Sequence, residues 1–142
     1  MKKRTFAVDI DGTITENGGG RIHLDSLEAL RRLTNMGHNV IFVTGRSSVE
    51  AFLLAIFGGT THIAVGENGG CITTQTNEHT LFGNLDECKK AFDLIQKNID
   101  NVKTKPVFPR MTEVVLERTF DLDDAQKLLS ENNINVELSD SQ

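Results

Sequence analysis

The sequence predicts an α/β protein whose first half is built on a parallel β-sheet. Two observations support this class. Short apolar runs alternate with helical patterns in the order strand, helix, strand, helix, strand, and that order implies a parallel sheet with right-handed crossovers. The runs are also apolar at nearly every position, as in strands that are buried on both faces.

Three runs are predicted to be the strands of this sheet: "TFAVDI" at residues 5–10, "NVIFVTG" at 39–45 and "THIAV" at 61–65. A helix is expected in the first connection, where leucines lie on one apolar stripe and a glycine follows. These residues are Leu24, Leu27, Leu30, Leu33 and Gly37. In the second connection "SSVE" has the spacing of a capping box, so a helix is expected to begin there.

The second half has the pattern of a small α+β lobe. Helices are predicted over residues 84–99 and 121–133, the latter capped by Asp121 or Asp123, and strands over 112–118 and 134–139. We expect a boundary near residue 80, which divides the chain into a core domain, residues 1–80, and a second domain, residues 81–142.

Composition narrows the possible partners. The net charge is −5, so no basic surface indicates nucleic-acid binding. The longest apolar run, "AFLLAIF", is too short to span a membrane. Cys71 and Cys88 have no metal-ligand spacing and are expected to be reduced thiols, with a disulfide as the alternative. We therefore expect a soluble, cytoplasmic protein.

The candidate chemistry begins at Asp9 and Asp11, which follow the first strand. Strand side chains alternate between faces, so both carboxylates can point the same way while Ile10 points into the core. Two close carboxylates repel each other, and a Mg²⁺ ion, which prefers carboxylate oxygens, would relieve that repulsion. The alternative is a turn rich in Asp and Gly, two common turn residues.

Three motifs resemble those of the haloacid dehalogenase superfamily. "DIDGTIT" is similar to its first motif, DxDGT, and "VTGRS" to its second. "GENGG" resembles a turn of the subgroup that has a cap domain inserted after the third strand. Together they are most similar to archaeal-type phosphoglycolate phosphatases. The resemblance implies a Rossmannoid parallel sheet in residues 1–80 and a partial C2-type α+β cap in residues 81–142. Gly18–Gly20 match neither GxGxxG nor a Walker A motif, and we expect them to form a flap over the site.

The resemblance also implies roles for the two aspartates. Asp9 would be the nucleophile that forms an aspartyl-phosphate, and Asp11 the acid and base that moves the proton. A covalent intermediate splits phosphoester hydrolysis into two easier steps, and a general acid helps an alkoxide to leave. In the family Mg²⁺ is held by the first carboxylate and by the backbone carbonyl of the second aspartate, here Asp9 and Asp11.

Five further residues are candidates at the ends of the second and third strands. Thr44 and Gly45 are expected to bind phosphate oxygens through a hydroxyl and backbone amides. Arg46 could reach an anion or pair with an acidic neighbour. Glu67 and Asn68 could face the cap or the substrate, although Asn followed by Gly is also ordinary turn chemistry.

The resemblance implies a phosphoric monoester hydrolase that acts on a small phosphorylated metabolite, most simply 2-phosphoglycolate. A phosphatase for another sugar phosphate, or a non-catalytic remnant that acts as a binding or assembly partner, is the alternative. The family's later lysine and its GD…ND pair are not found in the 142 residues. We therefore expect weak metal binding and poor turnover. We also expect an uncovered edge on the first strand, which a homo-oligomer or a second chain would complete.

Overall fold

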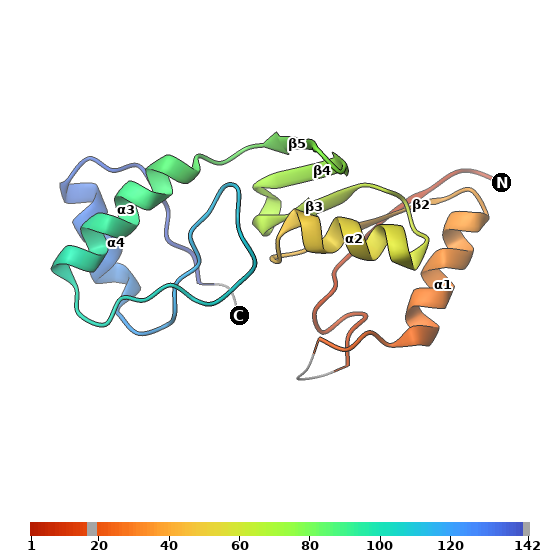
Figure 1. Ribbon diagram of the computed structural model, residues 1–142, viewed down its shortest axis with the longest axis horizontal. Helices are drawn as coiled ribbons and strands as arrows, with labels where there is room; N and C mark the ends of the chain where they lie inside the picture. Colours follow the sequence, from red (N-terminus) through yellow and green to blue (C-terminus); the bar gives the residue numbers. More distant parts are fainter. Residues whose placement is uncertain (17–19, 141–142) are drawn as a thin grey trace. The chain divides into compact units, whose positions relative to one another are not determined.

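The computed structural model describes residues 1–16 and 20–140 (Figure 1). The chain divides into two compact units, Met1–Phe82 and Gly83–Gln142, and each is described by itself. Most of the predicted glycine flap, residues 18–19, lies outside the described residues.

The first unit contains a five-stranded sheet in the order β1-β2-β3-β4-β5. β1 (Thr5–Val8), β2 (Asn39–Val43) and β3 (Ala64–Gly66) are parallel, which confirms the predicted α/β class. β4 (Cys71–Gln75) and β5 (Glu78–Leu81) extend the sheet as an antiparallel hairpin.

Helices α1 (Leu24–Asn35) and α2 (Ser48–Gly58) pack into one apolar core with the parallel strands. α2 begins at the predicted capping box, in which Ser47 and Glu50 bond each other's backbone. Leu27 and Leu30 pack against this core, but Leu24 is 76% exposed because it is the first residue of α1. The buried members of the core are Ile10, Ile14, Phe42, Ala51, Phe52, Ala55 and Ala64.

The expectation that the first strand is buried on both faces is wrong. Phe6 and Val8 are half-buried, whereas Thr5 and Ala7 are exposed. Alternate residues of a strand point to opposite faces of the sheet. Val8 packs against the core that the sheet shares with α1 and α2, whereas Thr5 and Ala7 point to the other face, where they are exposed.

The β4–β5 hairpin lies where the sequence analysis expected only a domain boundary. Two signals could have revealed it. Ile72, Thr73 and Thr74 are three consecutive β-branched residues, which favour a strand. Thr76 and Asn77, which follow Gln75, form a two-residue turn. The segment was not predicted as a strand because it is polar, and it is polar because only one face of the strand is buried.

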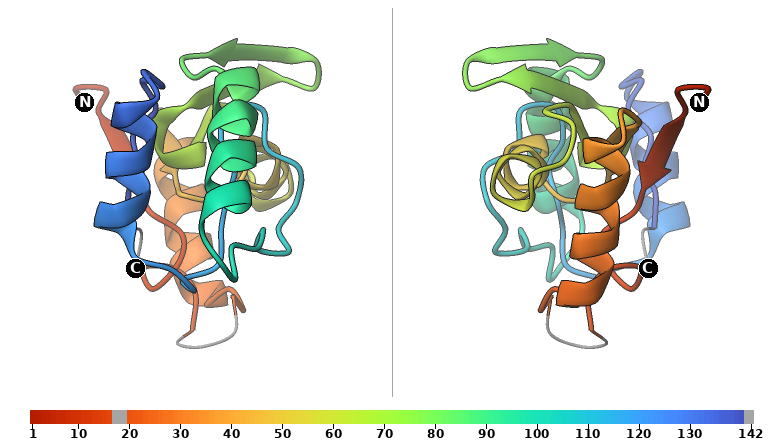
Figure 2. Two further views of the ribbon diagram at one scale, coloured as in Figure 1. Left: turned by 90° about the vertical axis from the view of Figure 1, so that its left-hand side faces the viewer. Right: turned by 90° about the vertical axis from the view of Figure 1, so that its right-hand side faces the viewer.

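The second unit is built on α3 (Leu85–Asn98) and α4 (Leu122–Glu131), which lie side by side (Figures 1 and 2). Asp121 caps α4 by accepting a hydrogen bond from the Asp124 backbone N–H, as predicted. The two helices bury a small core of Ala91, Ile95, Val102, Ala125 and Leu129. No helix among the described residues is long and apolar enough to cross a membrane.

The strands predicted at 112–118 and 134–139 do not form among the described residues. The first region contains only an isolated bridge between Thr104 and Leu116. In the second, the Gln126 side chain donates to the Val136 carbonyl (3.1 Å) and accepts from the Leu138 N–H (2.9 Å). The Gln126 amide thus satisfies backbone groups that a neighbouring strand would otherwise satisfy. An alternating apolar pattern predicts an extended segment, but it does not show whether a partner strand is available.

Both cysteines are free, as expected. Cys71 is buried, and its sulfur accepts a hydrogen bond from the Ser48 hydroxyl (3.1 Å), whereas Cys88 is half-buried.

Gly66 joins β3 to the start of α2 by direct backbone contact. A Cβ atom at this position would lie 2.2 Å from the Ser48 nitrogen and 2.4 Å from its Cα. Gly66→Ala should therefore lower the free energy of unfolding by about 3 kcal/mol, since backbone atoms cannot yield as a side chain does. Urea denaturation measures the loss.

Gly58→Ala is the matched control. Its Cβ would meet only side-chain atoms of Leu27 within 4 Å, the nearest being Cδ1 at 2.9 Å. A flexible side chain can move away, and alanine favours the helix. Equal losses of stability in the two variants would contradict the assignment of Gly66 as a close backbone contact.

Candidate active site

Three loops that follow parallel strands meet at one edge of the sheet. Residues 9–11 follow β1, residues 44–46 follow β2, and η1 (Glu67–Gly69) follows β3. The carboxyl ends of adjacent parallel strands lie at the same edge, where open α/β sheets bind ligands. All seven candidate residues lie in these three loops.

Hydrogen bonds join the three loops directly. The Arg46 guanidinium bonds both carboxylate oxygens of Asp11, at 2.7 and 2.9 Å. The Glu67 N–H donates to the Arg46 carbonyl (2.7 Å), and the Asn68 N–H donates to the Thr44 carbonyl (3.2 Å). The loops therefore form one connected site.

Asp9 lies just beyond the end of β1 and is exposed. Its Oδ1 accepts a hydrogen bond from the Ile10 N–H (2.8 Å). Ile10 is only 4% exposed and packs into the core, as the alternation of strand side chains predicts. Asp11 is exposed as well, so neither carboxylate is a fully buried charge.

Arg46 bridges two carboxylates. Besides Asp11, it bonds Glu50 at 3.1 Å, so of the two roles considered for Arg46 the structure has the acidic pairing. The hydrogen bond from Arg46 lowers the pKa of Asp11, and the same bond raises the pKa of Arg46. The sequence identified Glu50 only through its capping-box spacing. Its contact with Arg46 has the i, i+4 spacing of helical ion pairs, a signal that could have revealed it.

Thr44 is buried at 5% exposure directly after β2. Its hydroxyl accepts a hydrogen bond from the Arg46 N–H (3.1 Å), and in that bond the hydroxyl hydrogen is not used. Next to it, Gly45 lies against the Asn68 side chain, since a Cβ on Gly45 would be 2.9 Å from Asn68 Oδ1. A glycine at this position lets the second and third loops approach closely.

Glu67 and Asn68 both adopt left-handed backbone conformations, with φ of 54° and 56°. Asn tolerates this region, but Glu does so at a cost in free energy. Glu67 is buried, whereas Asn68 is exposed. The two backbone hydrogen bonds to Arg46 and Thr44 hold the strained turn in place. The turn chemistry expected of Asn68 and Gly69 is therefore observed, and the catalytic role of these residues stays a prediction.

The donor set is compatible with Mg²⁺ at Asp9 and Asp11. The described residues contain no group of three or more His, Cys, Asp or Glu side chains placed to hold a metal ion. Mg²⁺ does not require such a group, because it commonly binds one or two carboxylates and keeps several waters. The exposed Asp9 carboxylate, together with the backbone carbonyl of Asp11 two positions further on, fits this pattern.

Residues 6–138 match the family of haloacid dehalogenase-like hydrolases, and the chain belongs to that family. The chain is 75% identical over 142 residues to a phosphoglycolate phosphatase of Nitrosopumilus maritimus. It is 33% identical over 142 residues to a phosphoglycolate phosphatase of Methanosarcina mazei.

The matches cover nearly all of this chain but only part of the other proteins. The chain spans 62% of the Nitrosopumilus protein and 61% of the Methanosarcina protein. A crystal structure from Thermoplasma acidophilum, 20% identical, has a TM-score of 0.74 over 94% of this chain and 58% of that chain. At this identity the likeness shows the fold alone.

The ion pair between Asp11 and Arg46 should stabilise the fold only while Asp11 is ionised. Because the pKa of Asp11 is lowered in the folded state, the contribution is present at neutral pH and lost as the pH falls below about 4. Arg46→Gln should lower the free energy of unfolding at pH 7 by about 1 kcal/mol or less, since both side chains are partly exposed. Urea denaturation from pH 7 to about pH 3 measures the difference.

A double-mutant cycle supplies the control. In an Asp11→Asn background, Arg46→Gln should cost less than in the original chain, because the pair is already broken. Equal costs in the two backgrounds would show that Arg46 stabilises the fold through other contacts.

Proposed function

We propose that this site belongs to a magnesium-dependent phosphomonoesterase that works through an aspartyl-phosphate intermediate. The supporting observation is that three motif-bearing loops meet at the carboxyl edge of the sheet. Hydrogen bonds of Arg46 and Thr44 join these loops. Membership of the haloacid dehalogenase-like hydrolase family supports the same chemistry.

In this proposal the Asp9 carboxylate attacks the phosphorus, and the bond to the leaving alkoxide breaks. Asp11 donates a proton to that alkoxide and later accepts one from the water that hydrolyses the acyl phosphate. The Asp9 carboxylate and the Asp11 backbone carbonyl would hold a Mg²⁺ ion, whose charge offsets those of the phosphate and the carboxylates. The exposure of both side chains leaves them accessible to a substrate.

Thr44 and Gly45 are proposed to bind the phosphate oxygens. The Thr44 hydroxyl accepts from Arg46 and so can donate its hydrogen to a phosphate oxygen. Donors that are already fixed in place stabilise the charge of the transition state without having to reorganise.

Asp11 can act as an acid only after its ion pair opens. In the structure both of its oxygens accept hydrogen bonds from Arg46, which favours the ionised carboxylate. Glu50 already bonds Arg46 at 3.1 Å and offers the guanidinium a partner after Asp11 is released. We therefore propose that Arg46 releases Asp11 during the reaction and then bonds Glu50 or the phosphate of the substrate.

The proposed substrate is 2-phosphoglycolate, because the 75% identical Nitrosopumilus relative is a phosphoglycolate phosphatase. A phosphatase for another sugar phosphate is the alternative, and a panel of substrates distinguishes the two. Hydrolysis of 2-phosphoglycolate should have a kcat/KM at least about tenfold above that of glucose 6-phosphate, a difference that one or two polar contacts can supply.

The central test is phosphate release by the purified chain from 2-phosphoglycolate and p-nitrophenyl phosphate. Asp9→Asn should abolish Mg²⁺-dependent turnover, by roughly a thousandfold or more, because the amide is not a nucleophile. EDTA should remove the activity, and added Mg²⁺ should restore it.

Asp93→Asn is the matched control, since Asp93 lies exposed on α3 and makes the same change of charge. Turnover that survives Asp9→Asn would reject Asp9 as the nucleophile. No turnover, together with no Mg²⁺-dependent binding of orthovanadate, would instead favour a non-catalytic binding or assembly role.

A further inference from the structure

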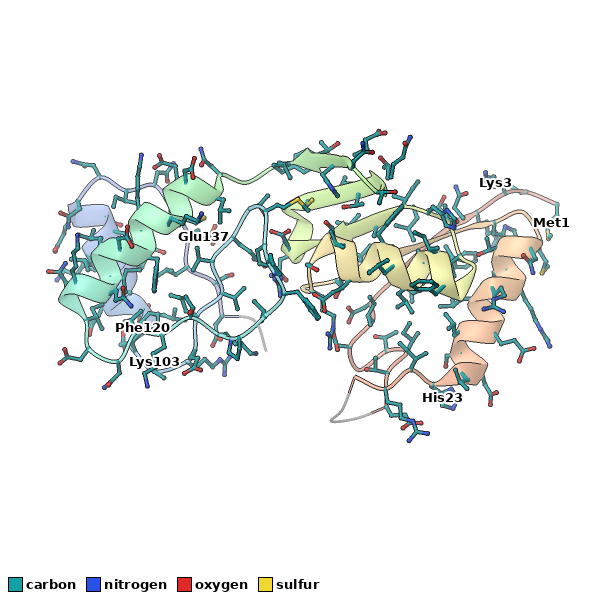
Figure 3. The ribbon with its side chains drawn as sticks, viewed as in Figure 1. Met1, Lys3, His23, Lys103, Phe120 and Glu137 are labelled. Atoms are coloured by element: carbon teal, nitrogen blue, oxygen red, sulfur yellow. The ribbon has the colours of Figure 1, made fainter. Side chains whose placement is uncertain are left out.

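Four polar side chains of the β4–β5 hairpin and of α2 bond one another, and the proposed catalysis uses none of them. Figure 3 shows the side chains of these elements as sticks. We call the four residues the polar row: Ser48, Cys71, Thr73 and His79. The first three are at most 1% exposed, and His79 is half-buried. Because buried hydroxyl groups need hydrogen-bond partners, the positions of these side chains depend on one another.

The hydrogen bonds of the polar row have a fixed direction. The Thr73 hydroxyl donates to Ser48 Oγ (2.7 Å), and the Ser48 hydroxyl donates to Cys71 Sγ (3.1 Å). A hydroxyl group has only one hydrogen, so Thr73 Oγ1 accepts in its contact with His79 Nδ1 at 2.8 Å. The His79 ring therefore carries a hydrogen on Nδ1 and orients the Thr73 hydroxyl toward α2.

Ser48 is the first residue of α2 and connects the polar row to the candidate active site. The preceding residue, Ser47, donates its backbone N–H (3.1 Å) and its hydroxyl (2.8 Å) to Glu50 Oε2. The other oxygen of Glu50 accepts from Arg46 (3.1 Å), and Arg46 bonds Asp11. A shift of Ser48 would therefore displace the carboxylate that holds Arg46, and with it the partner of the proposed acid.

We propose that Thr73 is a positioning residue for the candidate active site, because its hydroxyl holds Ser48 and thereby the first turn of α2. Gly66 brings β3 against this turn, and the Thr73 hydroxyl adds a directional bond from β4. Close packing prevents a nearer approach, whereas a hydrogen bond also opposes a sideways shift, since it weakens steeply as its angle changes. This inference rests on the proposed function, in which Asp11 transfers the proton.

The ring of His79 tests the direction of the polar row. Proton–nitrogen correlation spectra of the labelled chain should show a hydrogen on Nδ1. Thr73→Val should shift the Nδ1 signal, because the acceptor of that hydrogen is lost. A ring whose only hydrogen lies on Nε2 would reverse the row and overturn the proposal.

Hydrogen exchange tests the positioning without requiring activity. The Ser47 and Glu50 amides bond the Glu50 and Ser47 side chains, respectively. In Thr73→Val their exchange should accelerate by roughly fivefold relative to the amides of α1 in the same variant, as expected for the loss of one net hydrogen bond. Thr73→Ser keeps the hydroxyl and should restore the slow exchange.

Thr60→Val is the matched control. It replaces a hydroxyl by a methyl group at a residue that is 4% exposed and whose Oγ1 has no hydrogen-bond partner among the described residues. Thr60 follows the other end of α2, so exchange at Ser47 and Glu50 should not change. Equal acceleration in the two valine variants, or no rescue by Thr73→Ser, would overturn the proposal.

The leaving group of the substrate separates a displaced acid from a general loss of stability. Thr73→Val should lower kcat/KM for 2-phosphoglycolate by roughly tenfold, because its alkoxide leaving group needs a proton. The loss should be less than about twofold for p-nitrophenyl phosphate, whose phenolate leaves without one. A merely structural effect would lower both values equally and would overturn the proposal.

The two kinds of measurement keep this inference distinct from the proposed function. A chain without turnover on either substrate would reject the proposed function, while hydrogen exchange would still show whether Thr73 holds the first turn of α2. Normal turnover together with unchanged exchange in Thr73→Val would instead reject the positioning role alone.

Discussion

The contact of Gly66 with the backbone at the start of α2 is the constraint on which the site depends. Because Gly66 has no side chain, the end of β3 lies against Ser47 and Ser48. This proximity brings the loop after β3 within hydrogen-bonding distance of the loop after β2, through the Arg46 and Thr44 carbonyls. The same contact sets the position of the capping box of α2, and so of Glu50. A larger residue would separate two of the three motif-bearing loops.

Arg46 organises the charges that this packing brings together. Its guanidinium holds Asp11 by two hydrogen bonds and Glu50 by one, so its charge partly balances the negative charges of these two carboxylates. The planar guanidinium suits this task, because its donors can bond two carboxylates at once. The arrangement describes a resting site. In the proposed reaction, Asp11 must leave the ion pair, and Glu50 keeps Arg46 from becoming an unpaired charge.

The two units satisfy the backbone hydrogen-bonding groups of extended segments in different ways. In the second unit, the Gln126 side chain bonds the backbone at Val136 and Leu138, and an extended segment is held without a partner strand. In the first unit the outer edge of β1 is open in the described part of the chain.

The sequence by itself determined the α/β class, the parallel order of the first three strands, the capping box at Ser47 and the family, because periodicity and short motifs are local properties. It also identified the seven candidate residues that the three loops bring together. Tertiary structure decided the rest. Whether residues 134–139 become a strand depends on whether a neighbouring strand is available, and in the structure the Gln126 side chain bonds this segment instead. The pairing of Arg46 with Asp11 likewise joins residues 35 positions apart, a proximity created only by the folding of β1 beside β2.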